Sequence, residues 1–188
     1  MRQSNYRISN IRHTITLLVI YLFLASGVVT AEQTLPKLGF QLNKLSEPFD
    51  APDFNLQDMD ENTFSLEDFH GKVLLINFWA TWCPPCRREL PSMERLYQKL
   101  QDTDFIVIAI NQLESSDHVF SYMGDLGTDP SFPILFDLES KVSEAYRVVG
   151  IPTTYLVDKM GKVRFRAIGG REFDHPEVEK IIRDLLAE

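Results

Sequence analysis

Residues 73–86 read VLLINFWATWCPPC, and this stretch decides the fold. Its first eight residues form an almost continuous apolar run of strand length, which is typical of a central strand covered on both faces. A C-x-x-C pair follows directly, with two prolines where the first turn of a helix tolerates missing N–H groups. The stretch therefore predicts a buried strand that leads into a helix over about residues 84–100, with the cysteines at its N-terminus.

Cys83 and Cys86 are the only two cysteines of the 188 residues. A bridge between them closes a very small loop and stabilises the chain little. At a helix N-terminus, free backbone amides and a partial positive charge favour a thiolate over a thiol. We expect Cys83 to be the exposed nucleophile and Cys86, one turn deeper, to be the resolving thiol that breaks a mixed disulfide.

Other interpretations of the cysteine pair have less support in the sequence. A structural zinc site needs four ligands, and the four histidines are scattered without ligand spacing. The peroxiredoxin pattern Pro-x-x-x-Thr-x-x-Cys would require proline at position 76, which is Ile76. A copper-binding module that uses the two sulfurs as soft ligands stays open as a different class of function, although no His- or Met-rich stretch accompanies the pair. The histidines are His13, His70, His118 and His175.

The rest of the chain alternates strand and helix patterns. The turn DKMG at 158–161 indicates a hairpin between the last two strands. Asp174, with Glu177 three residues later, predicts the N-cap of a final helix that runs to about Ala187. This order predicts an α/β sandwich around a mixed sheet. Further strands are expected at 105–110, 133–136, 153–157 and 163–168, and further helices at 116–126 and 140–148.

The N-terminal segment differs from the rest of the chain. Residues 1–31 hold three arginines and no acid, and an 18-residue uncharged run, Thr14 to Ala31, ends in small residues. This pattern indicates an export signal, either cleaved or retained as a membrane anchor. It would place everything after Glu32 outside the inner face of the membrane. We assign 1–31 to this signal, 32–50 to a stalk or loosely packed lead-in, and 51–188 to the folded domain.

Composition and charge exclude several classes of function. The chain is 44% hydrophobic and carries a net charge of −8, from 27 acids and 19 bases. Because three bases lie in residues 1–31, the remaining chain has 16 bases against 27 acids, a net charge of −11. The length suits one globular domain with a short extra segment. The acidic balance argues against a nucleic-acid partner, since phosphate binding relies on clustered Lys and Arg.

The motifs together resemble a known family. WCPPC after an apolar strand, Pro91 five residues beyond Cys86, and the stretch IPTTYLVD at 151–158 are similar to the thioredoxin fold. More narrowly, the chain resembles the exported thiol-disulfide oxidoreductases of the TlpA/ResA type, with a lead strand pattern APDF at 51–54 and an extra segment at about 113–130. The resemblance spans about 51–188. It implies a mixed central sheet flanked by helices, with an insertion after the second core strand.

The same resemblance implies a substrate-binding surface. Pro152 should be in the cis form and face the C-x-x-C. The backbone of Ile151 would then be free to pair with an extended substrate segment in the manner of strand addition. We expect Trp82 to cover Cys83 and Trp79 to lie deeper. The predicted substrate-binding residues are Trp82, Pro84, Pro85, Ile151, Pro152 and Thr153.

A departure from thioredoxin identifies a third catalytic candidate. Thioredoxin carries a buried Asp in the strand before its motif, and the matching residue here is Asn77, which does not titrate near neutral pH. In the ResA-type pattern an acid follows the second cysteine by three residues, which is Glu89. Positions i and i+3 share a helix face, so a partly buried Glu89 with a raised pKa would accept the Cys86 proton. The alternative is an acid that faces solvent.

The resemblance implies a function that needs no metal or organic cofactor. We expect an exported reductase of protein disulfides. Proteins of this type often act in cytochrome c maturation, and a thiol donor in the membrane would re-reduce the cysteine pair. Because Pro84 and Pro85 offer no N–H to a thiolate, we expect a redox potential nearer the roughly −270 mV of thioredoxin than the roughly −120 mV of DsbA. A disulfide oxidase or isomerase is the alternative within the class. A monomer is expected.

Overall fold

The computed structural model describes residues 37–126 and 130–188. The predicted export segment 1–31, the first residues of the lead-in and positions 127–129 of the extra segment lie outside this part of the chain. Within the described residues, no helix is both long enough and apolar enough to cross a membrane.

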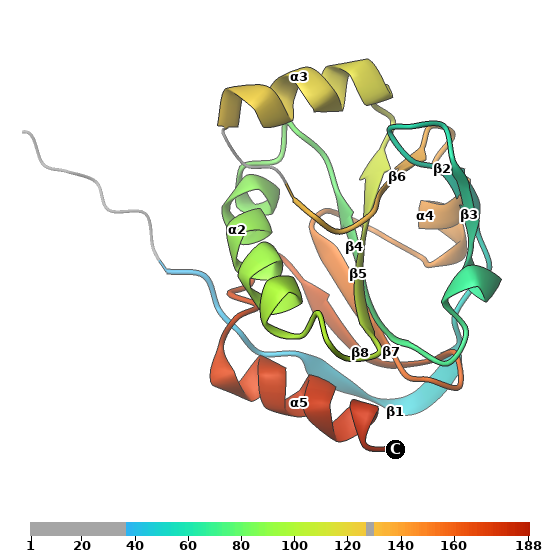
Figure 1. Ribbon diagram of the computed structural model, residues 1–188, viewed down its shortest axis with the longest axis vertical. Helices are drawn as coiled ribbons and strands as arrows, with labels where there is room; N and C mark the ends of the chain where they lie inside the picture. Colours follow the sequence, from blue (N-terminus) through green and yellow to red (C-terminus); the bar gives the residue numbers. More distant parts are fainter. Residues whose placement is uncertain (1–36, 127–129) are drawn as a thin grey trace, which may run out of the picture. The chain divides into compact units, whose positions relative to one another are not determined.

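A mixed eight-stranded sheet forms the centre of the domain, in the order β1-β8-β7-β4-β5-β6-β2-β3 (Figure 1). β4 runs parallel to β5, and β5 runs parallel to β6, whereas β7 pairs with β4 in the antiparallel sense. The predicted mixed sheet is therefore confirmed. The strands are β1 Asn43–Asp50, β2 Asn55–Gln57, β3 Thr63–Ser65, β4 Val73–Trp79, β5 Phe105–Gln112, β6 Ile134–Asp137, β7 Thr153–Val157 and β8 Lys162–Ile168.

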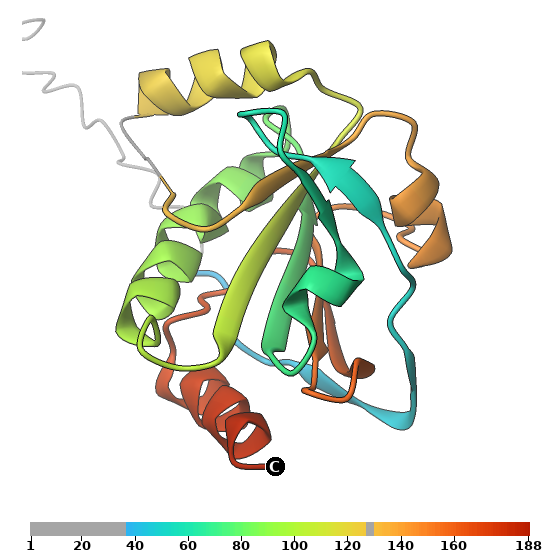
Figure 2. The same cartoon turned by 45° about the vertical axis from the view of Figure 1, so that its right-hand side comes forward.

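Helices cover both faces of the sheet (Figures 1 and 2). α2 (Pro84–Lys99), α3 (Ser116–Leu126) and α5 (Pro176–Leu186) supply residues to one apolar core, and α4 (Lys141–Ala145) supplies residues to the other. A short 3₁₀ helix, η1 (Leu66–Phe69), follows β3. The predicted helices over 84–100 and 116–126 are confirmed.

β4 is the central strand that the sequence predicts. All seven of its residues are buried. Leu75 and Trp79 belong to the core beneath α2 and α5, whereas Leu74, Ile76 and Phe78 belong to the core on the opposite side. Because side chains alternate along a strand, Asn77 points to the same side as Leu75, toward α2. An amide side chain of β4 thus enters a largely apolar layer.

Residues 37–54 differ from the predicted boundaries. Residues Asn43–Asp50, assigned to a loose lead-in, form strand β1 and pair with β8 at the edge of the sheet. The folded unit begins at Lys37 rather than Ala51. The predicted lead strand at 51–54 is a loop, and the side chain of its last residue, Phe54, is buried. Periodicity missed β1 because all but one of its residues are exposed, so that backbone pairing defines the strand.

The last two helices also differ from the prediction. α4 is shorter than 140–148, and the chain leaves the helix through Arg147, whose φ is +53°. The N-cap of α5 is His175, whose Nδ1 accepts from the amide of Glu177 at 3.3 Å. The predicted N-cap, Asp174, accepts instead from Arg95 Nε at 2.6 Å. An ion pair between α2 and the loop before α5 therefore replaces the expected capping box.

Candidate active site

The cysteine pair lies at the junction of β4 and α2. Cys83 is the N-cap of α2, and a disulfide joins it to Cys86. The backbone amide of Cys86 donates to Cys83 Sγ at 3.3 Å. Cys83 is only 3% exposed and Cys86 is fully buried. The helix-terminal position is confirmed, but the expectation of an exposed Cys83 is wrong for this disulfide form, because Cys83 belongs to the apolar core.

The two tryptophans beside the pair have opposite environments. Trp79 ends β4 and is completely buried, as predicted for the deeper ring. Trp82 directly precedes Cys83 and is 68% exposed. A large apolar side chain on the surface next to the cysteines is available to contact another polypeptide. Its role as a cover for Cys83 stays a prediction.

A cis peptide bond joins Ile151 to Pro152, as the resemblance implied. The next residue, Thr153, pairs with Phe78 of β4 in the antiparallel ladder. This register places the cis-Pro loop at the end of β4 from which the cysteine loop departs. The Thr153 hydroxyl donates to Gly150 O at 2.6 Å, and the Gly169 amide donates to Pro152 O at 2.8 Å.

Glu89 lies one helical turn after Cys86 and is fully buried. Asn77 Nδ2 donates to Glu89 Oε1 at 2.8 Å, and the backbone amide of Arg171 donates to Oε2 at 2.9 Å. Burial raises the pKa of Glu89 to about 8, although both hydrogen bonds and the Arg171 charge act to lower it. The alternative of a solvent-facing acid is wrong. A carboxyl group with this pKa changes its protonation near neutral pH.

Sequence reasoning missed a polar cluster beneath the loop before Cys83. The carboxylate of Glu114, just beyond β5, accepts from the amide of Thr81 at 2.8 Å and from its hydroxyl at 2.5 Å. Asn111 Nδ2 donates to the same carboxylate at 2.8 Å. His118 Nε2 lies 3.1 Å from the Thr81 hydroxyl. A sequence signal for this cluster was Asn111, which directly follows the apolar run of β5.

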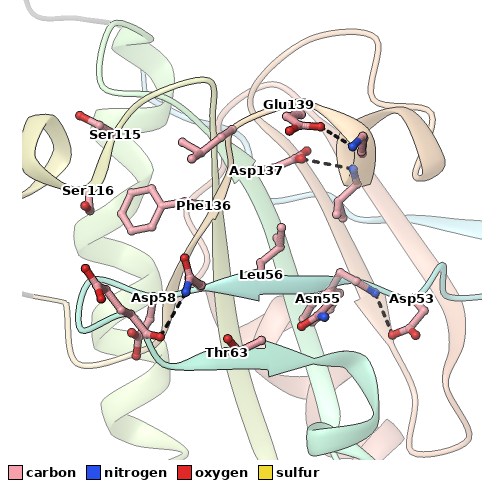
Figure 3. Close-up of a pocket in the computed structure, with 16 residues that line it drawn as sticks. Asp53, Asn55, Leu56, Asp58, Thr63, Ser115, Ser116, Phe136, Asp137 and Glu139 are labelled. Atoms are coloured by element: carbon pink, nitrogen blue, oxygen red, sulfur yellow. Dashed lines mark hydrogen bonds and ion pairs between the residues drawn. The ribbon is translucent and has the colours of Figure 1, made fainter.

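A cavity lies away from the cysteines. It has a volume of about 710 Å³ and is lined by β2, β6 and the first residues of α3 (Figure 3). Its buried carboxylate, Asp137, accepts from the amides of Val142 and Ser143 and so caps α4. Among residues 37–126 and 130–188, no group of three or more His, Cys, Asp or Glu is arranged to hold a metal ion. Neither cysteine lines the cavity, so it is separate from the candidate site.

A family comparison agrees with this geometry. The family model described as the AhpC/TSA family matches residues 49–166. The chain belongs to the AhpC/TSA family. Within this AhpC/TSA chain, Ile76 pairs with Ile108 and Tyr155 in the centre of the sheet. The proline that the peroxiredoxin pattern requires at position 76 would remove a ladder hydrogen bond there.

Within the family, the chain is similar to individual proteins of known name. This AhpC/TSA chain is 41% identical over 114 residues to the thiol-disulfide oxidoreductase ResA of Geobacillus thermodenitrificans, covering 61% of this chain and 64% of that protein. It is 38% identical over 119 residues to ResA of Bacillus subtilis, covering 63% and 65%. The match therefore spans slightly less than two thirds of the length of these relatives.

The solved structures agree in fold. A crystal structure of a candidate thiol:disulfide interchange protein DsbE from Chlorobium tepidum superposes with a TM-score of 0.68 at 31% identity. The match covers 78% of this chain and 99% of that one. The predicted thioredoxin-like architecture is thereby confirmed.

Proposed function

We propose that this protein is a thiol-disulfide oxidoreductase that reduces disulfides in other proteins. One observation carries the proposal: a disulfide at the N-terminus of a helix has a buried carboxyl group of raised pKa one turn away. The helix N-terminus stabilises a thiolate, and the carboxyl group offers a proton acceptor near neutral pH. The similarity to ResA supports the same chemistry.

The reaction starts from the dithiol form. The Cys83 thiolate attacks a substrate disulfide, forms a bond to one substrate sulfur and releases the other as a thiolate, which takes up a proton. Cys86 then transfers its proton to the Glu89 carboxylate and attacks Cys83 Sγ. The bond between Cys83 and the substrate breaks, and the second substrate sulfur leaves as a thiolate that takes up a proton. The Cys83–Cys86 disulfide of this structure results. Two electrons pass to the substrate, so a thiol donor must reduce the pair again.

Substrate contacts follow from the loops around the pair. Trp82 offers an exposed ring, and the cis-Pro loop lies at the same end of the sheet. We propose that the backbone of Ile151 pairs with an extended substrate segment while Pro84, Pro85, Pro152 and Thr153 border it.

The direction of the reaction is proposed from the donors to Cys83. Pro84 and Pro85 have no N–H, and the amide of Cys86 is the donor that contacts Cys83 Sγ. Few donors stabilise the thiolate weakly, which favours a reducing pair. We expect a potential nearer to roughly −270 mV than to −120 mV.

The cellular setting is also a proposal. The basic, acid-free start of the sequence and the uncharged run after it support export, with the folded unit on the outer side of the bacterial inner membrane. A membrane protein with a thiol pair would then supply electrons. The similarity to ResA makes an apocytochrome c with an oxidised cysteine pair a specific substrate to test.

Insulin reduction tests the activity. The full chain, supplied with dithiothreitol, should accelerate the precipitation of insulin chains, and the variant Cys83→Ser should not. Equilibration with glutathione buffers measures the potential. No acceleration would overturn the proposed reductase. A potential above about −170 mV would favour an oxidase, since it lies closer to DsbA than to thioredoxin. Tight binding of Cu(I) by the dithiol form without insulin reduction would favour the copper-binding alternative.

A further inference from the structure

Arg171 makes an unusual set of contacts in the loop between β8 and α5. Its guanidinium donates to the backbone carbonyls of Ile168 at 3.0 Å, Gly169 at 3.1 Å and Gly170 at 2.9 Å. Nε donates to the carbonyl of Gln41 at 2.9 Å. One side chain therefore binds four carbonyl oxygens, three of which belong to residues 168–170, directly before it in the chain. The planar, five-donor shape of arginine suits this arrangement, and a lysine ammonium offers only three donors.

The backbone of the same residue contacts the candidate proton acceptor. The Arg171 amide donates to Glu89 Oε2 at 2.9 Å. The Arg171 carbonyl lies 3.4 Å from the Ser92 hydroxyl, which also donates to Glu89 O at 2.8 Å. The position of the Glu89 carboxyl group therefore depends on where this loop lies.

The loop also lies against the redox motif. A Cβ atom added at Gly170 would come within 3.2 Å of Pro85 O and 3.1 Å of Leu38 Cδ2. Pro85 is one of the two residues between the cysteines. A side chain at this position would thus be crowded by Pro85 and by the N-terminal segment at the same time.

The N-terminal segment of the folded unit completes the contact. The Glu172 amide donates to Gly39 O at 2.7 Å, and Gly39 forms a parallel bridge with Arg171. Together with the bond from Arg171 to Gln41 O, these contacts fix residues 38–41 to the loop.

We propose that Arg171 is a positioning residue for Glu89. Its guanidinium holds the loop on residues 38–41, so that its own backbone amide stays directed at the Glu89 carboxyl group beside the cysteines. This inference rests on the proposed function only for the role of Glu89 in catalysis. The geometric relationship between Arg171 and Glu89 can be tested without any activity.

The groups around Glu89 make the test specific. Asn77 faces it from β4 and carries no charge, and Cys86 lies one turn earlier on the same helix. The charge of Arg171 acts on Glu89 and lowers its pKa. Loss of the arginine removes a nearby positive charge and releases the donating amide. Both changes destabilise the carboxylate form and so raise the pKa of Glu89.

The first experiment measures Glu89 directly. The carboxyl ¹³C shift of Glu89 is followed against pH by NMR in the full-length, oxidised protein. In Arg171→Ala the titration midpoint should rise by about half a pH unit or more, the direction expected when an opposite charge and a donor are lost. The matched control is Arg183→Ala, which removes an exposed α5 arginine paired with Glu179. It should leave the midpoint unchanged. An unchanged midpoint in folded Arg171→Ala overturns the proposal.

Arg171→Lys keeps the measurement decisive if the alanine variant does not fold. Lysine retains the charge but lacks the planar fork, so the midpoint should still rise, although less than in the alanine variant. A midpoint equal to that of the wild type in Arg171→Lys, with no folded alanine variant, overturns the proposal.

A double-mutant cycle then tests the catalytic consequence. Arg171→Ala should slow insulin reduction in the wild-type background and have no further effect in Glu89→Gln, because Arg171 acts through Glu89. An equal loss in both backgrounds overturns the proposal. If wild-type protein does not reduce insulin, the reductase function fails, whereas the NMR result still decides the geometric role of Arg171.

Discussion

Asn77 Nδ2 donates a hydrogen bond to Glu89 Oε1 at 2.8 Å, and the same amide group lies 2.9 Å from Thr154 Oγ1. A neutral side chain from β4 thus orients a buried acid from α2. Asn77 does not titrate, so Glu89 is the titratable group of this pair and the proton acceptor that we propose. Its bond to Asn77 and its bond to the Arg171 amide hold one oxygen each.

Replacing Glu89 by Gln should slow the resolving step. Glutamine has nearly the same shape but accepts no proton, so we expect insulin reduction to fall by about 10²-fold or more, within the usual range for loss of a general base. The dependence of the rate on pH near 8 should also disappear, because the Glu89 pKa of about 8 sets it. Rate–pH profiles of both proteins test this. Identical profiles would contradict a proton-transfer role.

The same substitution should change how the free energy of unfolding depends on pH. The folded-state pKa of Glu89, about 8, lies above its ordinary value of 4.5. Between these pH values the folded protein holds a proton that the unfolded chain has lost, so the free energy of unfolding falls as pH rises through the window. The fall is on the order of a few kcal/mol.

Denaturation of the oxidised protein at pH 5 and pH 9 measures this effect. Wild-type protein should lose more stability between the two pH values than Glu89→Gln, which lacks the titrating group. An equal loss in both proteins would mean that Glu89 keeps an ordinary pKa in the folded state.

Cys86→Ser should accumulate mixed disulfides with substrates. Without the resolving thiol, the bond between Cys83 and a substrate sulfur persists until an external thiol breaks it. Non-reducing gels and mass spectrometry of the purified variant would reveal the trapped partners. Cys83→Ser is the control and should trap far less, since the attacking sulfur is gone. Equal trapping by both variants would contradict the assigned roles.

Glu114→Ala should loosen the loop that leads to Cys83. The substitution leaves the Thr81 amide and Asn111 Nδ2 without the carboxylate that they contact. We expect a loss of roughly 1–3 kcal/mol in the free energy of unfolding, the usual cost of buried unpaired donors. Urea denaturation measures it. Glu139→Ala removes an exposed acid paired with Lys141 and should have little effect. Equal stability of the two variants would contradict the role of Glu114.

The central strand β4 and the edge strand β1 show where sequence reasoning works and where it fails. β4 was predictable because it is buried on both faces and therefore consists of a long apolar run. The edge strand β1 was not, since its exposed residues carry no apolar alternation and its strand geometry comes from pairing with β8. The N-cap of α5 was misassigned because Asp174 contacts Arg95, a residue of a different helix.

The sequence by itself indicated a mixed sheet and a redox pair at a helix N-terminus, because strand periodicity and helix-start signals are set by neighbouring residues. Its resemblance to the TlpA/ResA type implied the thioredoxin-like architecture and Glu89 as the third candidate. Only the tertiary structure decided how deeply Cys83 is buried and which groups contact Glu89. Arg171 is 82 residues from Glu89 in the chain, and their hydrogen bond exists only because the loop after β8 lies against the start of α2. Burial raises the pKa of Glu89, and burial is a property of the whole fold.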